Sequence, residues 1–175
     1  MTRMTREISY ILLIQPMLLT ACTQTPDFEP YDGRALRIAV VGEPPEANEE
    51  QVKFNEISFD ELTNEELSSY DAVIMTEENL PKAAEAKYAD TYSDSSIPFF
   101  FISASSHIPF TVKDPEYNDS WKWEAGKSYA VGVLKSKEND SFHSWGYGLY
   151  NDEMTDESIH DVYSRIFKTI DELNH

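Results

Sequence analysis

The sequence predicts an α/β fold, a three-layer sandwich in which helices cover both faces of a mostly parallel sheet. Two observations carry this prediction. Short apolar runs alternate with helix signals between residues 36 and 103, which is typical of parallel strands joined by helical crossovers. The chain also ends in a long amphipathic helical pattern. A change of character after residue 111 adds an antiparallel hairpin to the prediction.

Three apolar runs predict buried strands at residues 36–41, 72–75 and 97–102. Alternating apolar and polar residues over 52–59 predict one more strand, without fixing its register. Parallel strands that are buried on both faces read as continuous apolar runs, as the first three do. These segments therefore predict a mainly parallel sheet in the first half of the chain.

Helix signals separate the predicted strands. Ser58 and Thr63 are each followed three residues later by glutamate, which is the capping-box pattern. Asn79 before Pro81 is typical of a helix start. The residues that follow at four-residue spacing would share one helix face, and they are Leu80, Ala84, Tyr88 and Tyr92.

The C-terminal half predicts two strands, at residues 129–134 and 145–150, joined by the polar stretch 135–141. The last helix is the clearest element of the sequence, and Thr155 or Asp156 can cap it. Its apolar positions recur at helical spacing and are Ile159, Val162, Tyr163, Ile166, Phe167, Ile170 and Leu173.

The stretches at residues 69–75 and 97–103 resemble those of flavodoxin-like and receiver-like domains. The resemblance covers less than half of the chain and implies a flavodoxin-like arrangement of the first strands. Receiver domains place acidic residues directly after the first strand, whereas Gly42, Glu43 and two prolines stand there in this chain. The resemblance therefore does not extend to phosphoacceptor chemistry.

The N-terminal segment has the parts of a secretory signal. Arg3 and Arg6 precede an apolar run over residues 8–19, which is too short and too polar to span a membrane. The four residues 19–22, Leu-Thr-Ala-Cys, resemble the lipobox of bacterial lipoproteins, and the chain as a whole resembles small uncharacterised lipoproteins of Gram-positive bacteria. The resemblance implies cleavage before Cys22 and acyl chains on its sulfur. Alternatively, Cys22 is an ordinary small apolar residue.

The predicted organisation is a signal peptide over residues 1–21, a lipidated N-terminus with a flexible tether over 22–34, and one extracytoplasmic domain over 35–175. Cys22 is the sole cysteine, so no intrachain disulfide can form. The lipid bilayer, reached through acyl chains on Cys22, is thus a predicted partner. The predicted location is the outer face of the cell membrane.

The whole chain carries a net charge of −18, and the predicted signal peptide contributes +1, so the mature chain would stand at −19. This balance argues against nucleic acid as a partner, because phosphate binding needs clustered lysine and arginine. Apolar residues make up 41% of the chain, which excludes a disordered protein. The acidic surface indicates either recognition of basic partners or simple solubility.

Ligands of open parallel sheets bind beyond the carboxyl ends of the strands. This rule selects polar residues that follow the predicted strands, namely Glu43, Glu77, Glu78, Ser105 and His107. Glutamate and histidine side chains suit a divalent metal, and serine with histidine suits nucleophilic work. The sequence contains no established metal or catalytic motif. We therefore assign no catalytic residue, no metal and no cofactor, and ordinary solvated loop residues remain the alternative.

Aromatic residues are dense in the C-terminal half, and Trp121, Trp123 and Trp145 stand out among them. Exposed rings would bind a glycan or a partner protein, whereas buried rings would extend the core. The sequence therefore predicts a lipid-anchored binding or accessory module of the cell envelope, with an envelope protein or a glycan as partner. The alternatives are a surface-tethered hydrolase, a ligand-capturing protein that uses the carboxyl edge of the sheet, and an acidic immunity or inhibitor protein.

Overall fold

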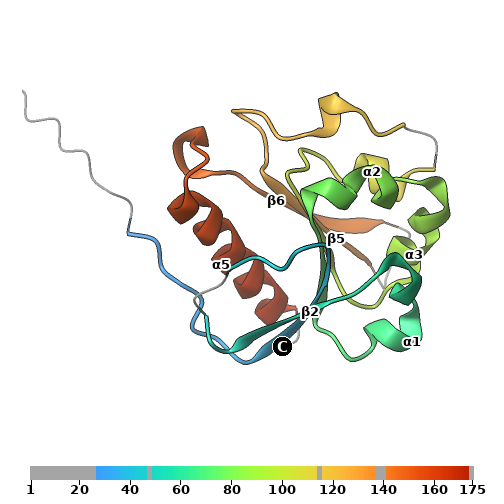
Figure 1. Cartoon of the computed structure of the whole chain (residues 1–175), viewed down its shortest axis with the longest axis horizontal. Coiled ribbons are helices and arrows are strands. Elements are labelled where there is room, and N and C mark those ends of the chain that lie inside the picture. The colour runs from blue at the N-terminus through green and yellow to red at the C-terminus, as the bar shows by residue number, and fades with distance from the viewer. Residues whose placement is uncertain (1–26, 47–48, 114–115, 137–140, 174–175) are drawn as a thin grey trace, which may run out of the picture.

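The computed structural model describes residues 27–46, 49–113, 116–136 and 141–173. The predicted signal peptide, Cys22 and the middle of the 135–141 connection lie outside these residues. Within them the fold is α/β, with one six-stranded mixed sheet and five α-helices (Figure 1).

The first four strands form the parallel part of the sheet. They are β1 (Leu36–Val41), β2 (Val52–Glu56), β3 (Ala72–Met75) and β4 (Phe99–Ile102). β1 lies between β2 and β3, and β4 pairs with β3, with all three pairs parallel. The predicted runs at 36–41 and 72–75 coincide with β1 and β3, and β4 begins two residues later than the run predicted at 97–102. All three strands are buried and pack on both faces of the sheet.

Two antiparallel strands complete the sheet. β5 (Ala130–Lys135) pairs with β4, and β6 (Phe142–Tyr147) pairs with β5, so the strand order is β2-β1-β3-β4-β5-β6. The hairpin is therefore present, but β6 lies three residues earlier than the sequence predicts. The rings at Trp145 and Tyr147 belong to the strand, whereas Tyr150 belongs to a short turn (Tyr150–Asp152) that follows it.

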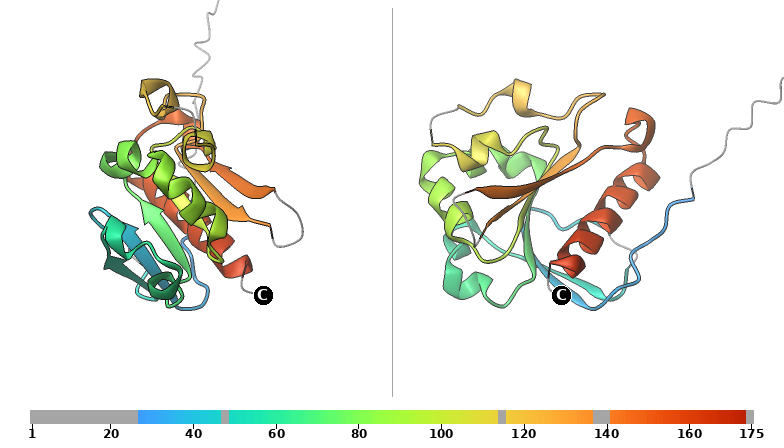
Figure 2. Two further views of the ribbon diagram at one scale, coloured as in Figure 1. Left: turned by 90° about the vertical axis from the view of Figure 1, so that its right-hand side faces the viewer. Right: turned by 180° about the vertical axis from the view of Figure 1, so that it is seen from behind.

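The helices lie on opposite faces of the sheet. The long helix α5 (Asp156–Glu172) covers one face. The other face carries the short helices α1 (Asn64–Leu67), α2 (Leu80–Ala83), α3 (Ala89–Asp94) and α4 (Ile108–Thr111). Figures 1 and 2 show α5 on one side of the sheet and α1, α2 and α3 on the other.

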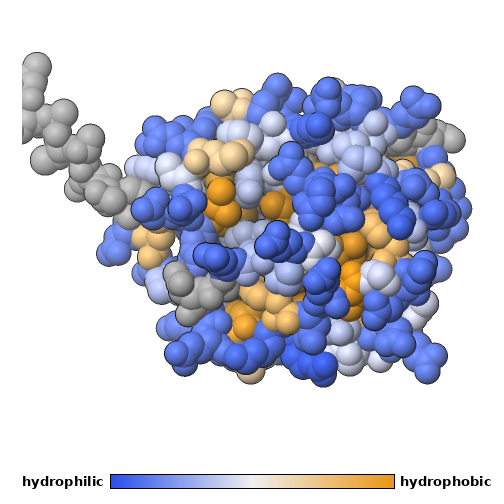
Figure 3. Space-filling view, in the orientation of Figure 1, coloured by the Kyte–Doolittle hydropathy of each residue, from blue (hydrophilic) through white to orange (hydrophobic). Residues whose placement is uncertain are grey.

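The core consists of two apolar clusters, because successive side chains of a strand point to opposite faces. In β4, Phe100 and Ile102 pack toward α5, whereas Phe99 and Phe101 pack toward the short helices. Both clusters consist of buried residues, and Phe100 and Phe101 are fully buried. Charged and polar groups cover most of the face drawn in Figure 3, with apolar groups in small patches between them.

The helix that the sequence predicts after Asn79 is broken into two. α2 ends at Ala83, and Glu85 has an extended backbone before α3 begins. The hydroxyl of Tyr92, on α3, donates a hydrogen bond of 2.8 Å to the carbonyl of Ala83. The break therefore lets Tyr92 reach back and satisfy a carbonyl that the end of α2 leaves open.

Residues 27–34, which the sequence assigns to a flexible spacer, pack against the domain. Tyr31 is 4% exposed and lies edge-on to Phe167 of α5. Its backbone carbonyl accepts a hydrogen bond of 2.8 Å from the side-chain amide of Gln51. Phe28 packs edge-on against Tyr150, near the start of α5. These contacts position the N-terminal end of the described chain beside α5.

Candidate functional site

The carboxyl ends of β1 and β3 meet in one hydrogen-bonded cluster. The side-chain amide of Asn79 donates to the carbonyl of Val41 at 3.2 Å and to Oγ1 of Thr76 at 3.1 Å. Oγ1 of Thr76 lies 3.0 Å from the Val41 carbonyl and donates to Oε1 of Glu78 at 2.5 Å. The two loops are therefore joined through side chains at the edge where ligands of such sheets bind.

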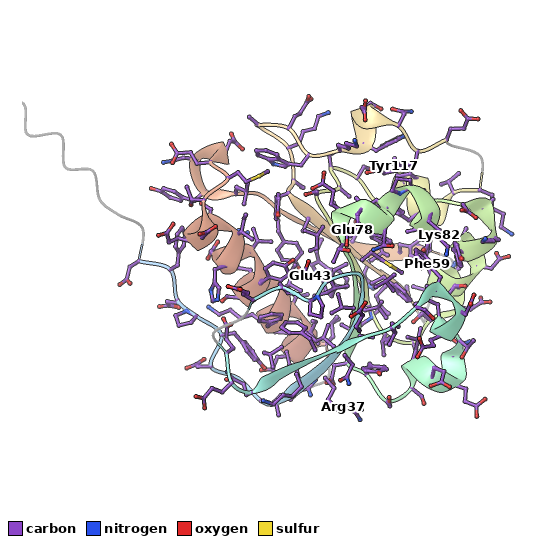
Figure 4. The ribbon with its side chains drawn as sticks, in the orientation of Figure 1. Arg37, Glu43, Phe59, Glu78, Lys82 and Tyr117 are labelled. Atoms are coloured by element: carbon purple, nitrogen blue, oxygen red, sulfur yellow. The ribbon has the colours of Figure 1, made fainter. Side chains whose placement is uncertain are left out.

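Glu78 is held in its charged form by this cluster. The hydrogen bond from Thr76 lowers the pKa of the Glu78 carboxyl, and the backbone N–H groups of Glu78 and Glu43 add to this effect. Glu43 and Glu78 come from different loops, and Figure 4 shows them near one another. Both side chains are exposed. Two of the three glutamates selected from the sequence, Glu43 and Glu78, thus lie at the same edge.

Ser103 is the most strained position of this edge. It directly follows β4, has a φ of 62° and is 4% exposed. Its carbonyl accepts a hydrogen bond of 2.8 Å from the backbone N–H of Trp123, and its side chain is hydrogen-bonded to Tyr129. A residue other than glycine in this backbone region persists only when its surroundings hold it there.

Tyr163 lies on the long helix α5 and is close to Tyr129 and Glu78 at this edge of the sheet. Burial raises the pKa of the Tyr163 phenol, and the nearby Tyr129 and Glu78 raise it further. Tyr163 also lines a cavity of about 420 Å³ between the loop after β1 and the first half of α5. The other residues that line this cavity are Pro45, Glu46, Asp156, Ile159 and His160.

A buried carboxylate, that of Glu49, lies beside His160, one of the residues that line the cavity. The side chain of Glu49 is 3% exposed, and its Oε1 accepts a hydrogen bond of 2.8 Å from the hydroxyl of Ser164. Its Oε2 lies 3.5 Å from Nε2 of His160, which lines the cavity. Sequence reasoning missed this cluster, because Glu49 lies in a polar loop and 115 residues separate it from Ser164.

The other residues selected from the sequence lie apart from that cavity. Glu77 is exposed and close enough to Tyr117 to help raise the pKa of the Tyr117 phenol, although burial is the larger cause. Ser105 donates from its hydroxyl to the carbonyl of Trp121 at 3.1 Å. His107 precedes α4, and burial lowers its pKa. Among the described residues, no group of three or more histidine, cysteine, aspartate or glutamate side chains is placed to hold a metal ion.

The three tryptophans are half-buried. Trp123 packs edge-on against Tyr129, and Trp145 packs against Phe100, so both extend the core on the α5 side. Nε1 of Trp121 donates to the carbonyl of Glu116 at 3.2 Å. Two of the three rings therefore have a packing role.

The buried tyrosines predict loss of stability in alkali. Burial raises the pKa of Tyr31, Tyr117 and Tyr147 to about 12, above the ordinary 10.0. Between pH 10 and about 12 the native state keeps tyrosine protons that the unfolded chain releases. The contribution of these tyrosines to the free energy of unfolding is therefore complete below pH 10 and is lost as the pH rises from 10 to about 12. A pH titration followed by the near-ultraviolet absorbance of tyrosinate should show a set of tyrosines that ionise late. The Tyr147→Phe variant should show one such tyrosine fewer. Titration of every tyrosine near pH 10 in folded protein would contradict this assignment.

The comparisons with known proteins found no relative of this chain. No family model matches the chain, and neither the curated proteins nor the solved structures include a significant match. The part of the chain that the structure describes also holds no helix long and apolar enough to cross a membrane. The functional assignment therefore depends on the residues and geometry described above.

Proposed function

We propose that this protein is a lipid-anchored extracytoplasmic lipoprotein whose α/β domain works as a binding or accessory module of the cell envelope. The lipobox-like residues 19–22 support the anchor, because Cys22 follows an apolar run and small residues. Acyl chains on Cys22 would supply the attachment, since a net charge of −18 disfavours electrostatic docking on anionic lipids.

The finer fold proposal is a three-layer sandwich with a flavodoxin-like first half. The strand order β2-β1-β3-β4 and the separation of α5 from the short helices support it. In such folds the ligand site lies beyond the carboxyl ends of the strands. The cluster around Thr76 and Glu78 occupies that edge.

The observation that carries the binding function is the cavity between the loop after β1 and α5. Its lining mixes apolar groups, such as Ile159 and Pro45, with the polar side chains of Glu46, Asp156 and His160. A concave site with an apolar lining and a few polar groups is typical of small-molecule recognition. Glycan or protein recognition by the half-buried tryptophans remains a second way in which the module would bind its partner.

The alternative of a surface-tethered hydrolase is favoured by one observation, the strained backbone of Ser103. Strained serines directly after a strand serve as nucleophiles in some hydrolases. Here the Ser103 side chain is buried and hydrogen-bonded to Tyr129. A hydrolase of this kind would lose its activity in Ser103→Ala, whereas a binding module would keep its ligand.

The anchor is tested by metabolic labelling with a radioactive fatty acid in the native host. We expect label on the wild-type chain and on the matched variant Thr23→Ala, and none on Cys22→Ser, because only the cysteine sulfur forms the thioether. Protease added to intact cells should digest the labelled protein if the domain lies outside. Label that persists on Cys22→Ser, or its absence from wild type, would refute the proposal.

A further inference from the structure

The N-terminal segment of the described chain follows α5 along its length. Phe28 lines a small cavity together with residues of the first turn of α5. Tyr31 packs edge-on against Phe167, and Nε of Arg34 lies 3.1 Å from Oδ1 of Asp171 in the last turn. Figure 1 shows this end of the chain and the start of α5 on the same side of the domain. The chain therefore enters the domain beside the first turn of α5.

A lipid on Cys22 would lie close to this entry point. Cys22 precedes Phe28 by six residues, which span about 20 Å when fully extended. After Phe28 the chain is fixed, because Tyr31 is buried and accepts a hydrogen bond of 2.8 Å from Gln51 at its backbone carbonyl. The surface around Phe28 is thus the part of the domain nearest to the bilayer. This inference rests on the proposed anchor, because the distance matters only if Cys22 carries lipid.

Two exposed apolar side chains lie on the connection that leads from β6 into α5, where Phe28 packs. Tyr150 is 41% exposed, and its ring lies edge-on to that of Phe28 with the centroids 5.7 Å apart. Met154 is 55% exposed and directly precedes Thr155, the residue that caps α5. Phe28 itself is half-buried. We call Phe28, Tyr150 and Met154 together the Phe28 patch.

A strained turn holds Tyr150 outside the core. Asn151 and Asp152, which follow it, have φ angles of 52° and 58°, in the left-handed region that favours glycine. The backbone N–H of Asp152 donates to the carbonyl of Leu149 at 3.2 Å, and Leu149 is buried in the core. Strained residues other than glycine persist where the surroundings fix them, and they cluster at functional sites. The fold therefore keeps the Tyr150 ring at the surface at a cost in backbone strain.

The side chains of the Phe28 patch suit the boundary between water and lipid. Aromatic rings with a polar tip, such as that of tyrosine, are enriched at membrane interfaces. Exposed acids beside the patch, Glu153 and Glu157 among them, disfavour attachment to anionic headgroups by charge. The contact must therefore be apolar, and the short tether supplies an effective concentration on the order of millimolar. We propose that the Phe28 patch inserts into the headgroup region of the membrane that holds Cys22, which fixes the orientation of the domain.

The first test asks which side of the domain touches lipid. The lipidated chain, purified from its native membrane, is placed in phosphatidylcholine nanodiscs that contain lipids with a spin label on the headgroup. Glu153→Cys beside the Phe28 patch and Glu65→Cys on α1 each add one thiol for a fluorophore, because lipid occupies the sulfur of Cys22, the sole native cysteine. Both glutamates are exposed, so the two variants are matched in charge. We expect strong quenching at position 153 and little at position 65, and equal quenching would overturn the inference.

The second test asks whether the quenching at position 153 depends on the apolar side chains, since the short tether alone also brings this position near the lipid. Tyr150→Ser combined with Met154→Ser should lower the ratio of docked to undocked domain about tenfold. The matched control is Ile108→Ser combined with Val112→Ser, which removes two apolar side chains at α4 that are 43% and 48% exposed. The control should leave the quenching unchanged. All four side chains are exposed, and circular dichroism checks that both variants fold.

The outcomes separate this inference from the anchor on which it rests. Unchanged quenching in the Tyr150 and Met154 variant, or an equal loss in the α4 control, would overturn the inference. Mass spectrometry of the same samples reports the lipid on Cys22. A chain that carries this lipid and fails the quenching tests leaves the anchor proposal standing. A chain without lipid on Cys22 refutes the anchor, and the docking of the Phe28 patch with it.

Discussion

Replacing Gly42 with alanine is expected to lower the free energy of unfolding by about 3 kcal/mol. Gly42 has a φ of 115°, a region that residues with a Cβ rarely adopt. An added Cβ would also lie 2.6 Å from Oε1 of Glu78 and 2.7 Å from Nδ2 of Asn79, and would overlap Oγ1 of Thr76. The substitution therefore strains the backbone and displaces the cluster that joins the ends of β1 and β3. Urea denaturation followed by circular dichroism measures the loss.

Gly126→Ala is the matched control for this prediction. Gly126 also has a positive φ, at 86°, but an added Cβ there would meet no atom within 4 Å. It should cost about 1 kcal/mol, from backbone strain alone. The difference between the two variants isolates the displaced cluster. Equal losses would show that the side chains around Gly42 move aside freely, against the tight junction described above.

Phe101→Ala is expected to lower the free energy of unfolding by about 3–5 kcal/mol. The Phe101 ring is fully buried and stacks on Phe110 with a centroid distance of 3.8 Å and an interplanar angle of 2°. Tyr92 packs edge-on against it from α3 at 5.3 Å. Removing the ring takes apolar surface from the core and leaves a cavity between β4 and two helices. The loss is measured by denaturant unfolding monitored through tryptophan fluorescence.

Phe142→Ala provides the comparison at the edge of the same sheet. Phe142 is half-buried on β6 and lies under the ammonium of Lys135, 5.2 Å from the ring centroid. Its neighbours can relax into solvent, so the expected loss is about 1 kcal/mol. A Phe101 variant no less stable than the Phe142 variant would contradict the assignment of the stacked rings to the core.

Much of the fold was predictable because local pattern and burial agree. The runs that became β1, β3 and β4 are apolar at every position that faces either cluster, and α5 has an unbroken apolar stripe. Thr155 caps α5 by accepting from the backbone of Ser158 at 3.2 Å, as the sequence suggests. The rule for parallel sheets selected Glu43 and Glu78 among other polar residues, and the structure places these two near one another.

The rest depends on long-range contacts that no local pattern encodes. Helical spacing continues through Ala84 and Tyr88, yet the helix breaks at Glu85, and the Tyr92 hydroxyl hydrogen-bonds the Ala83 carbonyl at the end of α2. The register of β6 is set by its pairing with β5, which places Trp145 opposite Gly132. Ser103 has no sequence signal for a left-handed backbone, because glycine is the residue that normally marks one.

The central claim, that Cys22 anchors the domain to the membrane, is tested most directly by mass spectrometry of the N-terminal peptide from protein purified out of its native membrane. The account predicts a peptide that begins at Cys22 and carries a diacylglyceryl group on the cysteine sulfur. A free thiol at Cys22, within a chain that still carries residues 1–21, would contradict it.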